Sequence, residues 1–448
     1  MSRVWLSAKI THLYNIWEVG RVKGIGEMHR VPRGRDGSCL AYSLVMKQKV
    51  LIVNKFYYPR GGDCIVAINT EKLLRARGHE TAVFAMDYPD NIDTPWKDRY
   101  ASRVDFGTSK VAAARRLLGM GDIRTSFGRI LDEFRPDVVH LNNIHSYLSP
   151  VVAEMAHRRG ARTVWTLHDY KLVCPSYTCM RDGRVCEDCV TGSKWGVVLH
   201  RCMKGSLAAG ALGWLEAVKW NRKRLEKSTD AFVCPSDFMR RMMEKAGFDP
   251  SRLHVLTNFL DPDKAAALGA ASADRGDYCC YIGRLSEEKG VRTMLEAASR
   301  LPYLFKVAGD GPLADELRDK YADSKNISFL GRLDAEEVVK LCSRARFSVL
   351  ASEWYENNPL GVIESLCMGT PVVGADIGGI PELIEPGKTG LVVPPGDADA
   401  LTKAFDKAWT TDWDHAAIAK AALARFSADT HYRALTEVYT TDRDRNSL

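Results

Sequence analysis

Two glutamates frame an expected helix start in the segment EWYENNPLGVIESLCMGTPVV, which runs from Glu353 to Val373. Glu356 and Glu364 lie on either side of an Asn-Asn-Pro-Leu-Gly turn. Proline is favoured in the first turn of a helix, so we expect a helix to begin near Pro359 with free N–H groups that would attract an anion. The two carboxylates could form a catalytic acid/base pair or a metal site, or could bind opposite parts of one ligand. Surface glutamates are the ordinary alternative.

Two further loops could hold an anion. The segment YYPRGGD places Gly61 and Gly62 between an expected strand and an expected helix, where the backbone can approach a diphosphate closely. The segment YIGRLSEEKG places Arg284 and Lys289 on a strand-to-helix loop, where a guanidinium and an ammonium could neutralise a diphosphate. The ordinary alternatives are a tight turn for the glycines and solvated charges for the two cations.

The cysteines are concentrated in one segment. Five of the twelve lie close together in sequence: Cys174, Cys179, Cys186, Cys189 and Cys202. The Cys-x2-Cys pair has the spacing of a zinc knuckle, and the cysteines on either side could complete a structural site of four thiolates. Cys179 and His200 are rival ligands, and unligated thiols are the alternative. Without a recognisable signal peptide, we expect metal rather than disulfides in this segment.

The composition indicates a globular protein of two or three domains. The chain has 448 residues, of which 46% are hydrophobic and 27% charged, and a formal net charge of +7. No apolar run reaches the length that spans a bilayer, so we expect a cytoplasmic location. Lys47–Leu256 carries 34 Lys and Arg against 23 Asp and Glu. This basic half could meet anionic lipid, a phosphorylated acceptor or nucleic acid, although scattered solubilising charge fits equally well.

Short apolar runs that end in polar residues alternate with helical stretches beyond residue 46. This alternation predicts doubly wound parallel sheets with ligands at the strand ends. We expect two similar α/β domains in tandem, at 47–257 and 258–427, with a ligand cleft between them. A cysteine-rich insertion occupies 174–202, and a helix and tail occupy 428–448. Residues 1–46 read as an extension that is disordered or that precedes the true start at Met46.

The ordered set of motifs resembles the retaining glycosyltransferases of family 4. The matching segments run from about Lys47 to about Lys407: GGD, RARGH, TLHDY, GRLSEEKG, AGDGP, FLGRL, ENNPLGVIE, GTPVVGADIGGIPELI and GKTGLVVPPGD. The resemblance implies the GT-B fold, in which two Rossmann-like doubly wound parallel-sheet domains face each other across a cleft. It also implies transfer of a hexosyl group from a nucleotide-diphosphate sugar to a glycan or lipid-linked acceptor. Bacterial exopolysaccharide, capsule or lipopolysaccharide biosynthesis is the expected setting.

The resemblance also implies roles for individual residues. Glu356 is placed beside the anomeric carbon of the donor sugar, and His168 of TLHDY is placed by the reacting centre with Asp169 to orient its ring. Glu364 is placed at the ribose hydroxyls. The implied donor-binding set also includes Gly61, Gly62, Arg284, Lys289, Asn358, Leu360 and Gly361. The segments that begin at Gly309 and Phe329 are implied to line the nucleobase pocket, and His140 and His145 could face the acceptor.

Cofactors and partners follow from the same resemblance. Catalysis is expected to need no metal or other cofactor. The insertion resembles that of a subset of the family, which favours Cys174, Cys186, Cys189 and Cys202 as ligands of a structural zinc. A basic first domain would suit peripheral contact with the anionic inner face of the membrane. The alternatives are a GT-B epimerase, a phosphorylase or a non-catalytic nucleotide-sugar binder, whereas nucleic acid is not an expected partner because no recognition motif is present.

Overall fold

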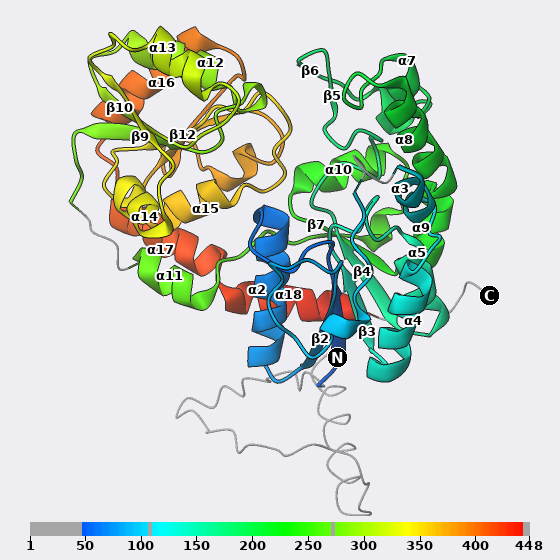
Figure 1. Ribbon diagram of the computed structural model, residues 1–448. Helices are drawn as coiled ribbons and strands as arrows, with labels where there is room; N and C mark the ends of the chain where they lie inside the picture. The colour runs from blue at the N-terminus through cyan, green and yellow to red at the C-terminus, as the bar shows by residue number, and fades with distance from the viewer. Residues whose placement is uncertain (1–46, 106–109, 270–273, 442–448) are drawn as a thin grey trace, which may run out of the picture. The chain divides into compact units, whose positions relative to one another are not determined.

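The computed structural model describes residues 47–105, 110–269 and 274–441 (Figure 1). The extension expected at residues 1–46 lies outside them. These described residues form one compact unit that contains two six-stranded sheets. We call each sheet with its helices a domain. The boundaries drawn from the sequence at 257/258 and 427/428 stay predictions.

The first domain is built on a wholly parallel sheet with the strand order β2-β1-β3-β4-β7-β8. Its strands are β1 (Lys49–Val53), β2 (Glu80–Phe84), β3 (Val138–Leu141), β4 (Arg162–Thr166), β7 (Ala231–Cys234) and β8 (Leu253–Val255). Its helices are α2 (Gly62–Ala76), α3 (Lys110–Leu117), α4 (Ile123–Phe134), α5 (Val151–Arg158), α9 (Arg222–Ser228) and α10 (Asp237–Lys245). Strand order reverses between β1 and β3, so polar residues that follow these two strands lie together at one edge.

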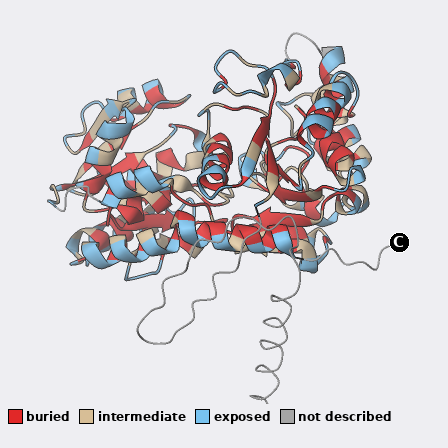
Figure 2. Ribbon diagram, turned by 90° about the horizontal axis from the view of Figure 1, so that it is seen from below, coloured by how far each residue is buried: buried red, intermediate tan, exposed pale blue. Residues whose placement is uncertain are grey.

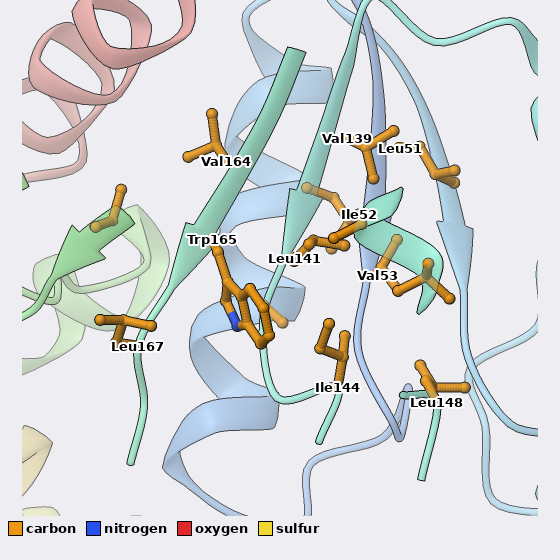
Figure 3. Packing of buried hydrophobic residues seen from close by; sticks show 14 of the residues in the cluster. Leu51, Ile52, Val53, Val139, Leu141, Ile144, Leu148, Val164, Trp165 and Leu167 are labelled. Atoms are coloured by element: carbon orange, nitrogen blue, oxygen red, sulfur yellow. The ribbon is translucent and has the colours of Figure 1, made fainter. Parts of the chain in front are cut away.

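Apolar side chains on both faces of the first sheet form its core. Leu51, Ile52 and Val53 of β1 are fully buried and pack beside Leu141 of β3 and Trp165 of β4 (Figure 3). Strands buried on both faces carry continuous apolar runs, which is why VLIV and VVHL could be recognised as strands from the sequence. In Figure 2 the strands are mostly buried, whereas the helices carry exposed residues on their outer sides.

The cysteine-rich insertion lies between β4 and α9. It contains a short antiparallel hairpin, β5 (Met180–Arg181) and β6 (Arg184–Val185), followed by α6 (Asp188–Thr191), α7 (Gly196–Leu199) and α8 (Leu207–Lys219). Helices α7 and α8 pack side by side (Figure 1). The helical part therefore extends past Cys202, the last residue of the insertion expected from the sequence.

The second domain is also built on a wholly parallel sheet, with the strand order β11-β10-β9-β12-β13-β14. Its strands are β9 (Tyr278–Ile282), β10 (Leu304–Ala308), β11 (Ile327–Gly331), β12 (Ser348–Leu350), β13 (Val372–Ala375) and β14 (Gly390–Val393). Its helices are α11 (Pro262–Gly269), α12 (Val291–Ser299), α13 (Ala314–Lys320), α14 (Ala335–Ser343), α15 (Leu360–Cys367), α16 (Ala398–Thr410) and α17 (His415–Arg425). Order reverses between β9 and β12, and this switch point positions the candidate site.

The last helix, α18 (Ala428–Thr440), returns to the first domain. The hydroxyl of Tyr432 lies 2.8 Å from Nε2 of His79, and that of Tyr439 lies 2.6 Å from Nδ1 of His140. Two parallel α/β domains, as the sequence predicts, are therefore confirmed, although the chain crosses between them a second time. Every helix within the described ranges is too short or too polar to cross a bilayer.

Candidate functional site

The switch point of the second sheet brings together the loops after β9 and β12. Lys289 ends the short 3₁₀ helix η3 (Glu287–Lys289) after β9, and its ammonium forms an ion pair with Oε1 of Glu356, which follows β12. The same oxygen accepts hydrogen bonds from Oγ of Ser352 at 2.9 Å and Nε1 of Trp354 at 2.8 Å. The Lys289 ammonium also lies 5.3 Å from the centre of the Trp354 ring. Two predicted site residues from distant segments are thus in direct contact.

Gly290 permits this close approach. Its φ is +63°, a left-handed conformation that glycine adopts without strain. A Cβ atom at this position would lie 1.9 Å from the carbonyl oxygen of Ala351, so no other residue fits without moving one of the two loops. The glycine of the EEKG motif therefore sets the distance between Lys289 and the loop that carries Glu356.

Helix α15 begins beside this pair, with Pro359 as its N-cap and Leu360 as its first residue. The first N–H groups of a helix have no partner within it, so those of Leu360 and Gly361 are available to an anion. A Cβ atom built on Gly361 would meet nothing within 4 Å, which shows open space at this end of α15. A Cβ atom on Gly62 would lie 3.9 Å from Cδ1 of Leu360. The start of α2 therefore lies beside the start of α15.

Asn358 fixes the start of α15 from behind. It is 6% exposed, and its Oδ1 accepts a hydrogen bond from the backbone N of Asn258 at 2.9 Å. Its carbonyl oxygen accepts a second bond, from Nδ2 of Asn258, also at 2.9 Å. Both oxygens of this predicted donor-binding residue are thus engaged by the segment that connects the domains. Sequence reasoning did not single out Asn258, for which the only signal was its place after β8.

Glu364 lies farther along α15, where its carboxylate forms an ion pair with the ammonium of Lys264 on α11. The side chain of Glu364 is 20% exposed and that of Lys264 is 42% exposed, so the pair faces solvent in part. Both predicted site glutamates therefore carry a lysine partner. Lys264 was not predicted from the sequence.

Arg284 lines a cavity of about 690 Å³ in the second domain. The predicted nucleobase segments contribute to its wall, with Gly309, Asp310, Gly311 and Pro312 from one segment and Arg332 and Leu333 from the other. The wall also includes Ile282, Gly283, Ala308 and Val338. Gly309 has φ +137°, and a Cβ atom there would lie 1.9 Å from the carbonyl oxygen of Gly283, so glycine is required for the strand ends to meet. Lys289 and Glu356 lie outside this wall.

His168 follows β4 in the first domain, as predicted. Its Nε2 lies 2.9 Å from Oδ1 of Asn142, the residue after β3. Burial lowers the pKa of His168, whereas the nearby carboxylate of Asp63 raises it. Burial alone would raise the pKa of Asp63. The pKa is nevertheless lowered, because the ammonium of Lys55 lies 3.4 Å from its carboxylate and His168 is also near. The first domain therefore adds an ionised carboxylate beside a histidine close to the Gly61–Gly62 loop.

Asp169 is not the hydrogen-bond partner of the His168 ring. Its Oδ1 accepts a bond from the backbone N of Lys171 at 2.9 Å and lies 3.7 Å from Nε2 of His145. Burial raises the pKa of Asp169. The expectation that this carboxylate orients His168 is corrected, because Asn142 holds the ring through the hydrogen bond described above.

The two other histidines considered for acceptor binding are buried. His140 is 2% exposed, and its ring nitrogens bond to the hydroxyls of Tyr439 at 2.6 Å and Thr166 at 2.7 Å. His145 is 8% exposed and packs against the ring of Trp165. Burial lowers the pKa of each to about 3. His140 is therefore a core residue rather than one that faces an acceptor, because both of its ring nitrogens are engaged inside the protein.

The cysteine set predicted as a zinc site is not supported. Within the described ranges, no three or more His, Cys, Asp or Glu side chains are grouped so as to hold a metal ion. The thiols of Cys174 and Cys179 share a hydrogen bond, which lowers the pKa of Cys174 to about 5. The thiol of Cys189 is directed to the carbonyl oxygen of Ser193 at 3.9 Å. The described residues therefore give no support to a zinc site at Cys174, Cys186, Cys189 and Cys202, which stays a prediction.

The insertion instead contacts the loop that carries Glu356. The hydroxyl of Tyr355 donates a hydrogen bond of 2.5 Å to Oε1 of Glu187, and the other carboxylate oxygen of Glu187 pairs with Lys245 on α10. The ring of Tyr355 packs against Phe238 at 4.6 Å and Tyr170 at 5.9 Å between centroids. This contact was not visible in the sequence, where Glu187 reads only as a spacer between two cysteines.

Comparison with known families covers most of the described chain. The family model "Glycosyltransferase Family 4" matches residues 61–264, and the model "Glycosyl transferases group 1" matches residues 270–425. The two matches follow each other in the order of the two domains.

Curated relatives match part of the chain. Alpha-D-kanosaminyltransferase of Streptomyces kanamyceticus is 29% identical over 208 residues, which are 42% of this chain and 53% of that protein. The lipopolysaccharide core biosynthesis glycosyltransferase LpsE of Rhizobium meliloti is 29% identical over 191 residues, which are 40% of this chain and 54% of that protein. The chain thus spans about half the length of each of these relatives.

A solved structure of Anabaena Alr3699/HepE in complex with UDP and glucose is similar to nearly the whole described chain. The TM-score is 0.59 at 17% identity, and the match covers 88% of this chain and 100% of that one. At this identity the likeness speaks for the fold alone. Together with the two parallel six-stranded sheets, it establishes the GT-B fold that the motifs imply.

Proposed function

Because the chain belongs to family 4 of the glycosyltransferases, we propose that it transfers a sugar from a nucleotide-diphosphate sugar to a glycan or lipid-linked acceptor, with retention of anomeric configuration. The observation that carries this proposal is the meeting of three anion-binding elements. They are the Lys289 ammonium, the free N–H groups at the start of α15, and the Gly61–Gly62 start of α2. A diphosphate is the anion that would use all three at once.

The remaining residues suit the rest of such a donor. The cavity beside Arg284 has the size of a small-molecule pocket, and it would take the nucleobase. Glu364, farther along α15, would accept hydrogen bonds from the ribose hydroxyls in place of its bond from Lys264. Glu356 would face the donor sugar, since it shares the ion pair with the cation of the diphosphate site. The complex of Anabaena HepE with UDP and glucose supports a donor of this class.

The charges at this site fit the departure of a diphosphate. As the bond between the anomeric carbon and the phosphate oxygen breaks, positive charge grows on the sugar and negative charge on the leaving group. Lys289 and Arg284, with the N–H groups of α15, would stabilise the leaving group, and one such donor is worth about 2.7–4 kcal/mol of barrier. The acceptor oxygen would bond to the same face of the anomeric carbon, and its proton would pass to the departing phosphate. We propose that this charge set acts without a divalent metal.

The acceptor is proposed from chemistry outside the donor site. The basic balance of Lys47–Leu256 would suit a lipid-linked or phosphorylated acceptor at an anionic membrane surface. The similarity to a glycosyltransferase of lipopolysaccharide core biosynthesis supports a place in bacterial surface polysaccharide assembly. His168, beside Asn142 and Asp63, would line the sugar side of the reaction.

A donor screen tests the proposal. Purified protein would be incubated with UDP-, GDP- and ADP-sugars, with release of the nucleoside diphosphate and the thermal midpoint as readouts. We expect one donor class to stabilise the protein and to be cleaved slowly without acceptor. Arg284→Ala should abolish the stabilisation, whereas Arg318→Ala, at an exposed arginine paired with Asp315 on α13, should leave it intact. Conversion of the donor sugar to its epimer would instead show an epimerase, and no response to any donor would reject the proposal.

A further inference from the structure

Helix α8 presents an apolar face to solvent. Leu207 is 52% exposed, Leu215 is 42% exposed and Val218 is 49% exposed. These residues, with Ala211 between them, are spaced by four, four and three positions, so they lie on one side of the helix. Trp214, on the same side, is half-buried. A surface helix of a globular protein ordinarily turns polar residues outward, and α8 does not.

The opposite side of α8 explains this reversal. Gly210 and Gly213 let the helix pack closely, because Cβ atoms there would lie 2.8 Å from the carbonyl oxygen of Val197 and 2.4 Å from Sδ of Met203. The single acidic residue of the helix, Glu216, points inward and is 4% exposed. It accepts a bond from the backbone N of Ser146 at 3.0 Å and pairs with Lys171 at 2.9 Å. Packing and charge therefore hold the glycine and glutamate side inward, and the apolar side outward.

The apolar surface continues onto α7. Leu199 is 64% exposed and Trp195 is 42% exposed, and the Trp195 ring contacts Trp214 edge-on at 4.9 Å between centroids. We define the α7–α8 face by its five exposed residues: Trp195, Leu199, Leu207, Leu215 and Val218. Elsewhere in the described ranges, exposed large apolar side chains are spread over other elements: Ile92, Val111, Met120, Tyr177, Val255 and Leu330. A concentration of this kind marks an interaction surface.

The exposed charged side chains of the α7–α8 segment itself are positive. The loop that joins α7 to α8 carries Arg201 and Lys204, both exposed, and neither forms an ion pair with another described residue. Residues 192–218 contain no acidic side chain apart from Glu216, which is buried. Helices that lie in the interface of an anionic bilayer carry leucine and tryptophan on one face, bordered by arginine and lysine. The α7–α8 face has this composition.

We propose that the α7–α8 face docks the protein on an anionic lipid surface. The apolar residues would enter the boundary between head groups and acyl chains, while Arg201 and Lys204 would meet the phosphate groups. A second copy of the chain fits less well as the occupant, because a symmetric contact would place Arg201 and Lys204 of one copy near the same cations of the other. This docking would bring the protein to the lipid-linked acceptor proposed above, and in that respect it rests on the proposed function. Its test does not require sugar transfer.

Vesicle flotation of the full chain tests the proposal. We expect binding to phosphatidylcholine vesicles that contain phosphatidylglycerol, weakened by high salt, and little binding to phosphatidylcholine alone. Each cation near such a surface contributes about fivefold to binding, so Arg201→Glu with Lys204→Glu should weaken it about 25-fold or more. Leu215→Ser with Val218→Ser should weaken binding about tenfold. About half of each apolar side chain is exposed in the free protein and would be buried by the lipid, and serine would lose that gain.

Matched controls separate the α7–α8 face from general effects. Val255→Ser changes a valine that is 44% exposed on β8, and Lys420→Glu reverses an exposed lysine on α17. Both controls should bind vesicles like the unchanged protein, and all variants should keep its thermal midpoint. Equal binding to neutral and anionic vesicles would overturn the proposal. The proposal would also be overturned if the control variants lost as much vesicle binding as the variants of the α7–α8 face. It would be overturned as well if the protein bound no vesicles and instead self-associated in a way that Leu215→Ser abolished. Because the assay contains no nucleotide sugar, such a failure leaves the proposed transfer reaction standing.

Discussion

Removal of the Lys289 ammonium separates its two expected tasks. Without donor the ammonium pairs with Glu356, whose Oε1 also accepts bonds from Ser352 and Trp354. With donor bound, the same ammonium would face the diphosphate. Lys289→Ala therefore affects the stability of the free protein through one partner and the rate of transfer through another. The two effects can be measured on one variant.

The expected magnitudes follow from the burial of the pair. The side chains are 22% and 12% exposed, which places the pair between exposed pairs, worth about 0–1 kcal/mol, and buried pairs, whose disruption costs about 3–5 kcal/mol. We expect a coupling of about 2 kcal/mol in a double-mutant cycle with Glu356→Ala, measured by denaturant unfolding. Loss of one cation at the leaving diphosphate should lower kcat about 10²–10³-fold. Steady-state kinetics with the donor found by the screen provides that value.

Lys388→Ala is the matched control, because Lys388 is 79% exposed and its pair with Glu385 lies on the surface. It should change neither stability nor kcat measurably. If Lys289→Ala kept the unchanged kcat while the coupling with Glu356 was found, the ammonium would be a structural partner only. The assignment of the diphosphate to this loop would then be refuted.

Two further predictions concern the insertion and the buried histidines. Tyr355→Phe removes the hydroxyl that donates to Glu187, so the donor KM should rise about fivefold while kcat stays nearly unchanged. A hydrogen bond to a charged group contributes about 1.5–3 kcal/mol before solvent screening. Glu187→Gln should have the same effect, and an unchanged KM in both variants would contradict a link between the insertion and donor binding. Burial lowers the pKa of His140 and His145 to about 3 and of His431 to about 4, so the unfolded chain binds protons below its ordinary histidine pKa while the folded protein does not. The free energy of unfolding should be highest above a pH of about 6.5 and should fall as the pH drops toward 4, by up to about 1.4 kcal/mol per pH unit for each histidine. In thermal unfolding, His140→Gln should lose less stability than the unchanged protein over the same pH range.

The parts of the site that could be predicted from sequence are those set by local structure. Short apolar runs identify buried strands, and polar or glycine residues that follow them must lie at the strand ends. This places Gly62, Arg284, Lys289 and Glu356 on loops at the ends of strands and helices without any knowledge of their partners. The helix start at Leu360 follows in the same way from Pro359.

Partners from distant segments could not be predicted. Lys264 and Glu364, or Asn258 and Asn358, are a hundred positions apart, and nothing local marks them as pairs. Their contacts depend on how α11 and the connecting segment pack against α15, which is a tertiary property.

The described residues do not support the predicted zinc site, for a related reason. Spacing in the insertion brings the cysteines near one another in sequence, but the direction of each thiol depends on backbone conformation. Cys179 has φ +50° and Tyr177 has φ +63°, left-handed conformations that residues other than glycine rarely adopt and that sequence spacing does not reveal. The thiols of Cys174 and Cys179 instead share a hydrogen bond, and Glu187, which lies between Cys186 and Cys189, contacts Tyr355.

The loop that carries Glu356 is held by contacts with the first domain as well as by contacts with its own. Nδ2 of Asn357 donates to the carbonyl oxygen of Leu167 at 2.7 Å, and its Oδ1 accepts a bond from Ser236 at 2.8 Å. Tyr355 reaches Glu187 of the insertion in the same stretch. These hydrogen bonds, together with the packing of the Tyr355 ring against Phe238 and Tyr170, would be lost together if the domains moved apart. The position of Glu356 beside Lys289 therefore depends on residues of the first domain, so a change near Ser236 or Glu187 should alter donor binding before it alters the fold.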